Sequence, residues 1–212
     1  MDIKLVSKNN NFLKSIWVAA RTCYSSLSPI ELCEQEPTEE EMLRITNIIM
    51  TSKHSSVLEH CSMTFAVKNV SRTLLAQYTR HRISVSLSVQ SQRYVSEQSS
   101  KNLEGIFDYV VPLTIEKNIE ANQVYVDFMK ACQAKYDELL SLGVNKEDAR
   151  FVLPGGAGTN FVTTLNLRSF MDVYHKRVIT PGAQWEIKEM MIAMKRLLVE
   201  QEPWLDKYLP EK

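Results

Sequence analysis

Cysteine is scarce in this sequence, and neither sign of charge is in excess. The four cysteines among 212 residues form no Cys-x-x-Cys pair. A chain of this length builds its core without disulfides, so we predict reduced thiols and a cytoplasmic setting. Lysine plus arginine and aspartate plus glutamate each number 25, which gives a formal net charge of zero. This balance argues against a protein that holds nucleic acid by overall charge, so any anion site must be local.

Long apolar runs, repeats and low-complexity tracts are also absent. The longest apolar runs, such as residues 16–20 and 190–194, cover only a few positions, whereas a membrane span needs about 18. Residues 1–4 (MDIK) show no apolar segment behind a basic start, so we predict no signal peptide and no membrane partner. With no linker visible, we expect residues 1–212 to form a single domain.

The spacing of apolar residues predicts more helix than strand. Helices are predicted over residues 11–24, 38–54, 71–81, 114–143, 169–177 and 182–202, with a short helix between Asn145 and Pro154. Strands are predicted over residues 2–7, 61–67 and 161–165, an extended segment over 84–94 and a loop over 29–36. Thr38 and Glu41 have capping-box spacing, and Gly143 is suited to end a helix. The scattered strands do not fit a doubly wound parallel sheet.

Arginine is concentrated where acidic residues are missing. Residues 61–96 contain no aspartate or glutamate, and neither do residues 149–171. The cations in or just after these stretches are Lys68, Arg72, Arg80, Arg82, Arg93, Arg150, Arg168, Lys176 and Arg177. Arginines without acidic neighbours stay in water or bind an anion from outside. The alternative is that they pair in the fold with the glutamate-rich run at residues 31–41.

Spacing strengthens the anion-binding interpretation. On the predicted helix, Gln77, Arg80 and His81 stand at i, i+3 and i+4 and share a face. In the extended segment, Ser91 and Arg93 share a face, and a hydroxyl beside a guanidinium suits phosphate or carboxylate. Charge-assisted hydrogen bonds contribute about 1.5–3 kcal/mol each, so three or four of them hold a nucleotide phosphate at micromolar affinity.

Two of these segments form a recognisable pair. Arg80-His81-Arg82, followed by the Ser-x-Arg-Tyr element at residues 91–94, resembles the signature of flavin-dependent thymidylate synthases. His54 with Glu59 and the histidine after it resembles the family's His-x-x-x-x-Glu-His element. Further matching segments lie at residues 20–23, 149–154, 166–169 and 183–186, in the family's order. Eight residues separate the two signature elements here, where the family usually has seven, which predicts a bulge.

The resemblance implies a fold, an activity and a set of ligands. The fold is α+β, a helix-rich single domain packed on a small, mostly antiparallel sheet, in a homotetramer with shared active sites. The activity is reductive methylation of dUMP to dTMP, with FAD as cofactor and 5,10-methylenetetrahydrofolate and NADPH as co-substrates. By matched position, FAD would contact His54, Arg80, His81, Arg82, Asn166 and Arg168, and dUMP would contact Gln77, Arg80, Ser91, Arg93, Arg150 and Arg177. No metal site is expected, because no His, Cys, Asp and Glu grouping has metal-ligand spacing.

Two residues receive catalytic roles from the resemblance. Arg177 would stabilise negative charge that develops on the pyrimidine ring. Ser91 is interpreted as a ligand of the phosphate or ring rather than a nucleophile, because its flanking glutamines are not the glycines of a nucleophile elbow. One alternative is an RNA-binding module that uses the basic residues 68–94, and another is a flavoprotein reductase of similar fold without specificity for dUMP.

Overall fold

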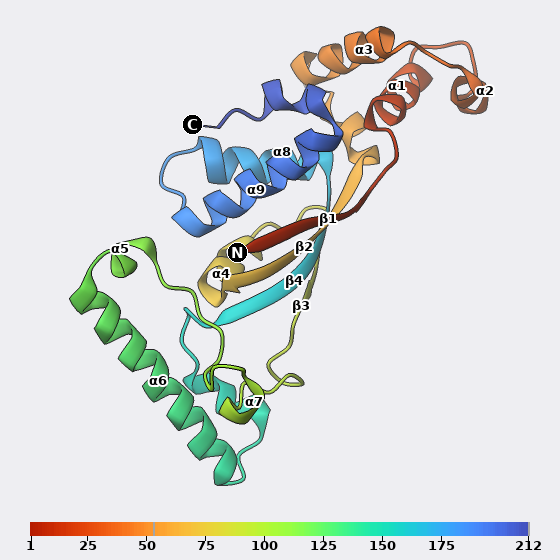
Figure 1. Cartoon of the computed structure of the whole chain (residues 1–212). Helices are drawn as coiled ribbons and strands as arrows, with labels where there is room; N and C mark the ends of the chain where they lie inside the picture. The colour runs from red at the N-terminus through yellow and green to blue at the C-terminus, as the bar shows by residue number, and fades with distance from the viewer. Residues whose placement is uncertain (53, 212) are drawn as a thin grey trace. The chain divides into compact units, whose positions relative to one another are not determined.

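The computed structural model describes residues 1–52 and 54–211 (Figure 1). The helices are α1 (Phe12–Thr22), α2 (Pro29–Glu34), α3 (Glu39–Ser52), α4 (Arg72–Tyr78), α5 (Leu113–Glu116), α6 (Ile119–Ser141), α7 (Lys146–Ala149), α8 (Leu167–Tyr174) and α9 (Trp185–Gln201). The strands are β1 (Asp2–Lys8), β2 (Ser62–Ser71), β3 (Val85–Val89) and β4 (Gly158–Asn166). Short 3₁₀ turns occupy η1 (Ser55–His60), η2 (Ser99–Lys101), η3 (Arg150–Val152) and η5 (Pro203–Tyr208), and η4 (His175–Ile179) is π-helical. Within these described residues, no helix combines the length and apolar character that crossing a membrane requires.

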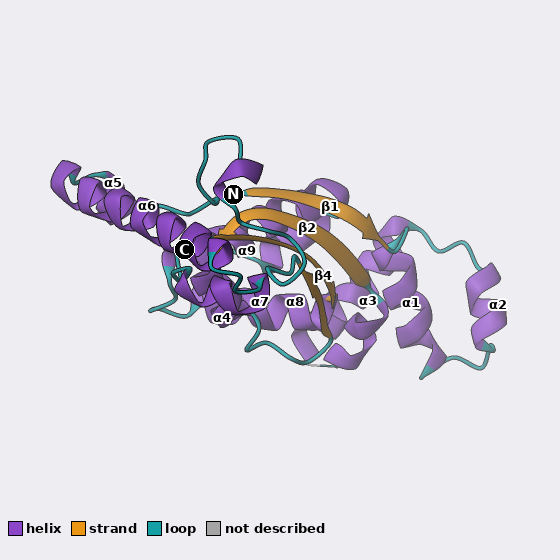
Figure 2. Ribbon diagram, turned by 90° about the horizontal axis from the view of Figure 1, so that it is seen from below, coloured by secondary structure: helices purple, strands orange, loops and turns teal. Residues whose placement is uncertain are grey.

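The four strands form one sheet in the order β1-β2-β4-β3 (Figure 1), and Figure 2 shows β1, β2 and β4 side by side. Its antiparallel register is visible between β2 and β4. The Thr64 and Thr164 hydroxyls lie 2.9 Å apart, and the Arg72 amide donates to the carbonyl of Ala157 at 3.0 Å. Residue numbers therefore decrease along β4 in the direction in which they increase along β2, as in an antiparallel pair. The predicted α+β fold with a small antiparallel sheet and many helices is confirmed.

The described residues divide into two compact units. Unit 1 contains residues 1–2, 67–80 and 88–162, and unit 2 contains residues 3–52, 54–66, 81–87 and 163–211. All four strands have residues in both units.

In unit 2, helix α1 packs on α3, and α8 packs on α9 and η1. The aromatic part of its core is a stack in which the ring of Phe170 lies 6.2 Å from those of both Phe65 and Tyr174. Unit 2 also contains a buried ion pair, in which Lys8 Nζ lies 2.6 Å from Glu202 Oε1. This core anchors α8, the helix that leads into the π-helical turn.

In unit 1, a smaller core forms under the long helix α6. Phe107, Met129, Cys132 and Ala157 are its buried members. The side chain of Gln133 ties the loop that precedes the helix to α6, because its Oε1 accepts from the Phe107 amide at 2.8 Å and its Nε2 donates to the Glu97 carbonyl at 3.0 Å.

Capping residues explain where the structure agrees with the sequence prediction and where it differs. The predicted box at Thr38 and Glu41 forms and starts α3, and Gly143 follows α6 with φ of 88°. The prediction of a loop over residues 29–36 was wrong, because Ser28 and Glu31 form a second capping box that starts α2. The predicted helix over 114–143 divides into α5 and α6, and Asn118 caps the second of these.

Candidate functional site

The Arg-His-Arg triplet lies in the connection between α4 and β3. Helix α4 ends at Tyr78, and the Thr79 hydroxyl donates to the carbonyl of Ala76 at 3.2 Å, satisfying one of the helix's terminal acceptors. The predicted helical face shared by Gln77, Arg80 and His81 therefore does not exist. Gln77 and Arg80 remain neighbours in unit 1, where the Arg80 amide donates to the Gln77 carbonyl at 3.4 Å.

The Ser-x-Arg-Tyr element is a turn, not the extended segment predicted over residues 84–94. Strand β3 ends at Val89, and the amides of Tyr94 and Val95 both donate to the Ser91 carbonyl, at 3.1 and 2.9 Å. The Ser91 hydroxyl accepts from the Arg93 amide at 3.2 Å. Serine favours such turns because its side chain bonds the backbone two residues on. The turn, rather than strand alternation, keeps Ser91 and Arg93 together.

Arg93 and Arg150 meet at one residue of α7 in unit 1. Arg93 Nη2 lies 2.9 Å from Glu147 Oε2, and Arg150 Nε donates to the Glu147 carbonyl at 2.9 Å. The Ser91 turn is tied to the same helix by Lys146, whose Nζ donates to the Tyr94 carbonyl at 3.1 Å. The expectation that Arg93 lacks a carboxylate partner was wrong.

In unit 2, the structure brings Arg177 and His81 together. Arg177 Nε donates to His81 Nε2 at 2.9 Å, so that histidine nitrogen accepts a hydrogen bond and carries no proton. The helix predicted over 169–177 begins at Leu167 and becomes π-helical at His175, which places the half-buried Arg177 in the wide turn. Such turns occur frequently at functional sites.

The remaining unit 2 candidates lie around α8 and η1. Asn166 caps α8 by accepting from the Ser169 amide at 2.8 Å. Arg168 is exposed and pairs with Glu59, with Nη1 2.5 Å from Oε1. His54 is exposed and precedes η1 without capping it.

Arg80 and Arg82 are exposed on the connection after α4. Among the residues that the structure describes, neither side chain forms an ion pair. These two guanidinium groups match the expectation of arginines without acidic partners.

Glu147 and Glu59 are the partners that sequence reasoning missed. The alternative considered there was the glutamate-rich run at residues 31–41, but Glu31 and Glu41 cap their own helices. A usable signal existed for both missed residues. Glu59 belongs to the matched His-x-x-x-x-Glu-His element, and Glu147 lies three positions before Arg150.

The buried cysteine thiols of the described residues are unsuited to act as nucleophiles. All four cysteines are free, and Cys61 and Cys132 are buried. Burial raises the pKa of the Cys61 thiol to about 12, so it is neutral at physiological pH.

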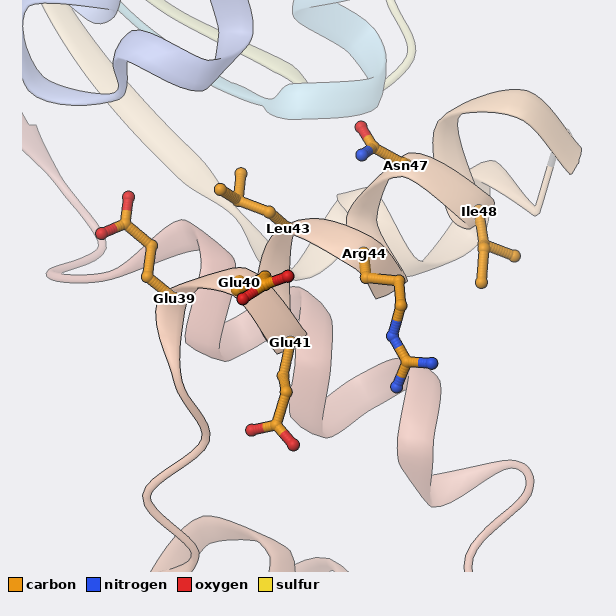
Figure 3. A pocket seen from close by; sticks show the side chains of 7 residues that line it. All are labelled: Glu39, Glu40, Glu41, Leu43, Arg44, Asn47 and Ile48. Atoms are coloured by element: carbon orange, nitrogen blue, oxygen red, sulfur yellow. The ribbon is translucent and has the colours of Figure 1, made fainter.

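A groove of about 880 Å³ follows helix α3 and is unrelated to these residues (Figure 3). Its lining residues are Glu39, Glu40, Glu41, Leu43, Arg44, Asn47 and Ile48. All come from one helix, and none is a predicted site residue. Three carboxylates at its start suit the helix N-terminus, which favours negative charge.

The predicted site residues therefore supply mostly cationic and neutral hydrogen-bond donors. Unit 1 holds Gln77, Arg80, Ser91, Arg93 and Arg150, and unit 2 holds His54, His81, Arg82, Asn166, Arg168 and Arg177. Guanidinium groups with exposed, weakly held carboxylate partners, here Arg93 and Arg168, are able to exchange those partners for phosphate or carboxylate ligands.

Comparison with solved structures supports the fold. A UMP/dUMP methylase, PolB, from Streptomyces cacaoi, solved with 5-Br dUMP, superimposes with a TM-score of 0.83 at 21% identity, covering 98% of this chain and 93% of that one. Thymidylate synthase X from Helicobacter pylori, solved with FAD and dUMP, gives a TM-score of 0.79 at 22% identity and covers 100% of both chains. At these identities the likeness establishes the architecture.

Sequence comparison establishes the family. The model described as "Thymidylate synthase complementing protein" matches residues 4–204. The flavin-dependent thymidylate synthase of Geobacter sulfurreducens is 37% identical over 198 residues, covering 93% of this chain and 82% of that protein. The Clostridium tetani protein of the same name is 33% identical over 222 residues, covering 97% and 85%. Because these matches contain both signature elements and nearly the whole chain, the chain belongs to the family of flavin-dependent thymidylate synthases.

Proposed function

We propose that this chain converts dUMP to dTMP by reductive methylation, with FAD as cofactor, 5,10-methylenetetrahydrofolate as carbon donor and NADPH as source of reducing equivalents. The observation that carries the proposal is the family match over residues 4–204, which contains all the predicted site residues. The same match favours the enzyme over the RNA-binding hypothesis.

The chemistry of the donors in unit 2 fits FAD. We assign its binding to His54, His81, Arg82, Asn166 and Arg168 of unit 2 and to Arg80, which belongs to unit 1. The exposed guanidinium groups of Arg82 and Arg168 suit a diphosphate, and the pairing of Arg168 with Glu59 is half-exposed and therefore weak enough to exchange. Bound FAD would supply hydride chemistry that no side chain provides.

The donors of unit 1, together with Arg177, are assigned to dUMP. Arg93 and Arg150 are held at Glu147, and the Ser91 turn lies against the same helix. In this assignment Gln77, Arg80, Ser91, Arg93 and Arg150 hold the nucleotide. Arg177, oriented by its hydrogen bond to His81, stabilises negative charge on the pyrimidine ring.

Ser91 is assigned as a ligand of the nucleotide and not as a nucleophile. Its hydroxyl accepts from the Arg93 amide, and within the described residues it makes no hydrogen bond to a general base. A serine hydroxyl needs such a base to become nucleophilic. Its proton is free to be donated to a phosphate or ring oxygen.

The assembly and setting are part of the proposal. We propose a homotetramer with shared active sites, and the exposed apolar side chains of α6 support self-association, since Ile119, Val124 and Phe128 are 88%, 70% and 55% exposed. We also propose that residues 1–212 act as a single domain, because all four strands have residues in both units. Four free cysteines support a cytoplasmic setting.

The direct test is release of tritium from 5-tritiated dUMP by the purified protein with FAD, methylenetetrahydrofolate and NADPH. We expect release that depends on all three and an equivalent yield of dTMP. Calorimetric titration with dUMP, UMP and dCMP identifies the preferred nucleotide. FAD reduction by NADPH without tritium release or dUMP binding would instead support the reductase alternative, and a colourless protein that binds RNA in a salt-dependent manner would support the RNA-binding one.

Arg177→Ala tests the assigned catalytic residue. Loss of a charge-assisted contact predicts a fall in kcat/KM for dUMP by a factor of about 10². Lys176→Ala is the matched control, because Lys176 is the adjacent exposed cation and pairs with Asp172 at 2.7 Å. Equal rates for wild type and Arg177→Ala would discard the assignment.

A further inference from the structure

Gln90, the residue just before the Ser91 turn, is held at three points in unit 1. Its amide donates to the Asn160 carbonyl at 2.9 Å, and its side-chain oxygen accepts from Asn160 Nδ2 at 2.6 Å. Its carbonyl accepts from Arg72 Nη2 at 3.4 Å. The position of Ser91 therefore depends on Arg72 and Asn160, which come from α4 and β4.

Arg72 occupies an unfavourable environment for a guanidinium. It is half-buried, and its Nε is buried with no hydrogen-bond partner within residues 1–52 and 54–211. Burial is the main cause that lowers the pKa of Arg72. Glu97 raises this pKa, and the charge of Arg150 lowers it. An apolar residue of similar length at this position would avoid these costs. Packing alone therefore does not explain why a charged arginine occupies position 72.

Glu97 is the acidic residue whose charge favours the charged form of Arg72. The pKa of Glu97 is raised mainly by burial and by Asp108, and Arg72 acts in the opposite direction. Glu97 follows the Ser91 turn, and Gln133 and Asn102 bind its carbonyl at 3.0 and 3.2 Å. The cation of Arg72 is therefore attracted to the chain just after the turn and donates to the chain just before it.

We propose that Arg72 is a positioning residue that holds the Ser91–Arg93 turn in the geometry that binds the dUMP phosphate. The assignment of that ligand rests on the proposed function, but the contact to the turn does not. Arg72 holds the start of the turn through the Gln90 carbonyl, and Glu97, a few residues after the turn, acts on its charge. Its contact with the turn is the hydrogen bond to the Gln90 carbonyl, so in this proposal Arg72 acts on the substrate through Ser91 and Arg93.

The first experiment measures the turn itself. Amide hydrogen exchange of the full-length protein is compared for wild type, Arg72→Met, Arg72→Lys and Lys68→Met. Methionine keeps the apolar stem and removes the charge and donors, and Lys68 is an exposed cation from the same unit that serves as control. We expect the amides of Tyr94 and Val95 to exchange about tenfold faster in Arg72→Met, with little change in α6 or in the control. Unchanged exchange at these amides would overturn the proposal even if the protein is an active thymidylate synthase.

The second experiment measures the consequence for substrate. Arg72→Met is expected to raise KM for dUMP about tenfold with kcat within about threefold of wild type and unchanged FAD absorbance, and Arg72→Lys should recover part of the loss. A purely structural role would instead lower kcat and FAD content together, and that result overturns the proposal. If Arg72→Met does not fold, Arg72→Lys alone decides, because one donor at a shifted position should still raise KM. Faster exchange in the turn without any dUMP binding by wild type would refute the proposed function and leave the positioning role intact.

Discussion

The ion pair between Arg93 and Glu147 allows a prediction in which two substitutions act in opposite directions. Both side chains are about half exposed, 48% and 49%. Exposed pairs of this kind contribute about 0.2–1 kcal/mol, whereas a charge-assisted hydrogen bond to phosphate contributes about 1.5–3 kcal/mol. A dianionic phosphate should therefore displace the carboxylate. Arg93→Ala should raise KM for dUMP by about 10- to 150-fold, and Glu147→Gln should lower it by up to about fivefold.

The assay is steady-state tritium release at several dUMP concentrations, together with calorimetric titration of dUMP. Glu104→Gln is the charge-matched control, because Glu104 is an exposed acid of the same unit and its removal tests the effect of net charge alone. The effect of Glu147→Gln should also shrink at high ionic strength, since salt screens exposed charges. Weaker dUMP binding in Glu147→Gln would refute the reasoning, because it would mean that the carboxylate orients Arg93 rather than competing for it.

Three further predictions concern stability. Lys8→Met leaves the buried Glu202 carboxylate without its cation and should lower the free energy of unfolding in urea by about 3–5 kcal/mol, and a loss below about 1 kcal/mol would contradict the importance of the pair. Ser84 has φ of 50°, so Ser84→Gly should relieve left-handed strain and raise stability by about 0.5–1 kcal/mol, and a lower melting temperature would contradict this. Burial raises the pKa of Cys61 from 9.0 to about 12. The thiol of the unfolded chain therefore ionises at lower pH than the thiol of the folded protein. The stability of the wild type below pH 9 should be lost progressively between pH 9 and 12, and Cys61→Ala should lose less over the same range. Identical pH profiles for the two proteins would exclude that contribution.

Local signals in the sequence were sufficient for several helix boundaries. Thr38 and Glu41 mark the start of α3 by side-chain bonds within four residues, and such bonds are readable from spacing. Ser28 and Glu31 have the same spacing, yet α2 was missed. That helix is six residues long and buries only Leu32, so it lacks the apolar periodicity by which helices are recognised.

The turns after α4 and β3 were harder to predict from the sequence than these helix boundaries. The helix predicted to reach residue 81 ends at Tyr78, and the segment expected to be extended turns at Ser91. In both places Thr79 or Ser91 bonds to nearby backbone, and these bonds compete with the continuation of the helix or strand. Propensity alone does not decide such competition.

The residues of the candidate site were identified by motif, but their partners were not. Arg93 and Glu147 are separated by 54 positions, and Arg168 and Glu59 by 109. A stretch without acids therefore says nothing about acids that the fold brings from elsewhere. Arg72 was recognised only as one of several cations, because its role depends on the Gln90 carbonyl, which no side-chain pattern encodes.

The π-helical turn has a consequence for changes in chain length. The Thr180 amide reaches the His175 carbonyl at 2.8 Å across a turn that holds one residue more than an α-helical one. Deleting Lys176 would let the turn close as an α-helix while the segments on either side keep their places. Arg177 would then be rotated by about 100° around the helix axis, away from His81. Loss of a single residue here should yield a chain that still folds but no longer holds Arg177, to which we assign the catalytic role, beside His81.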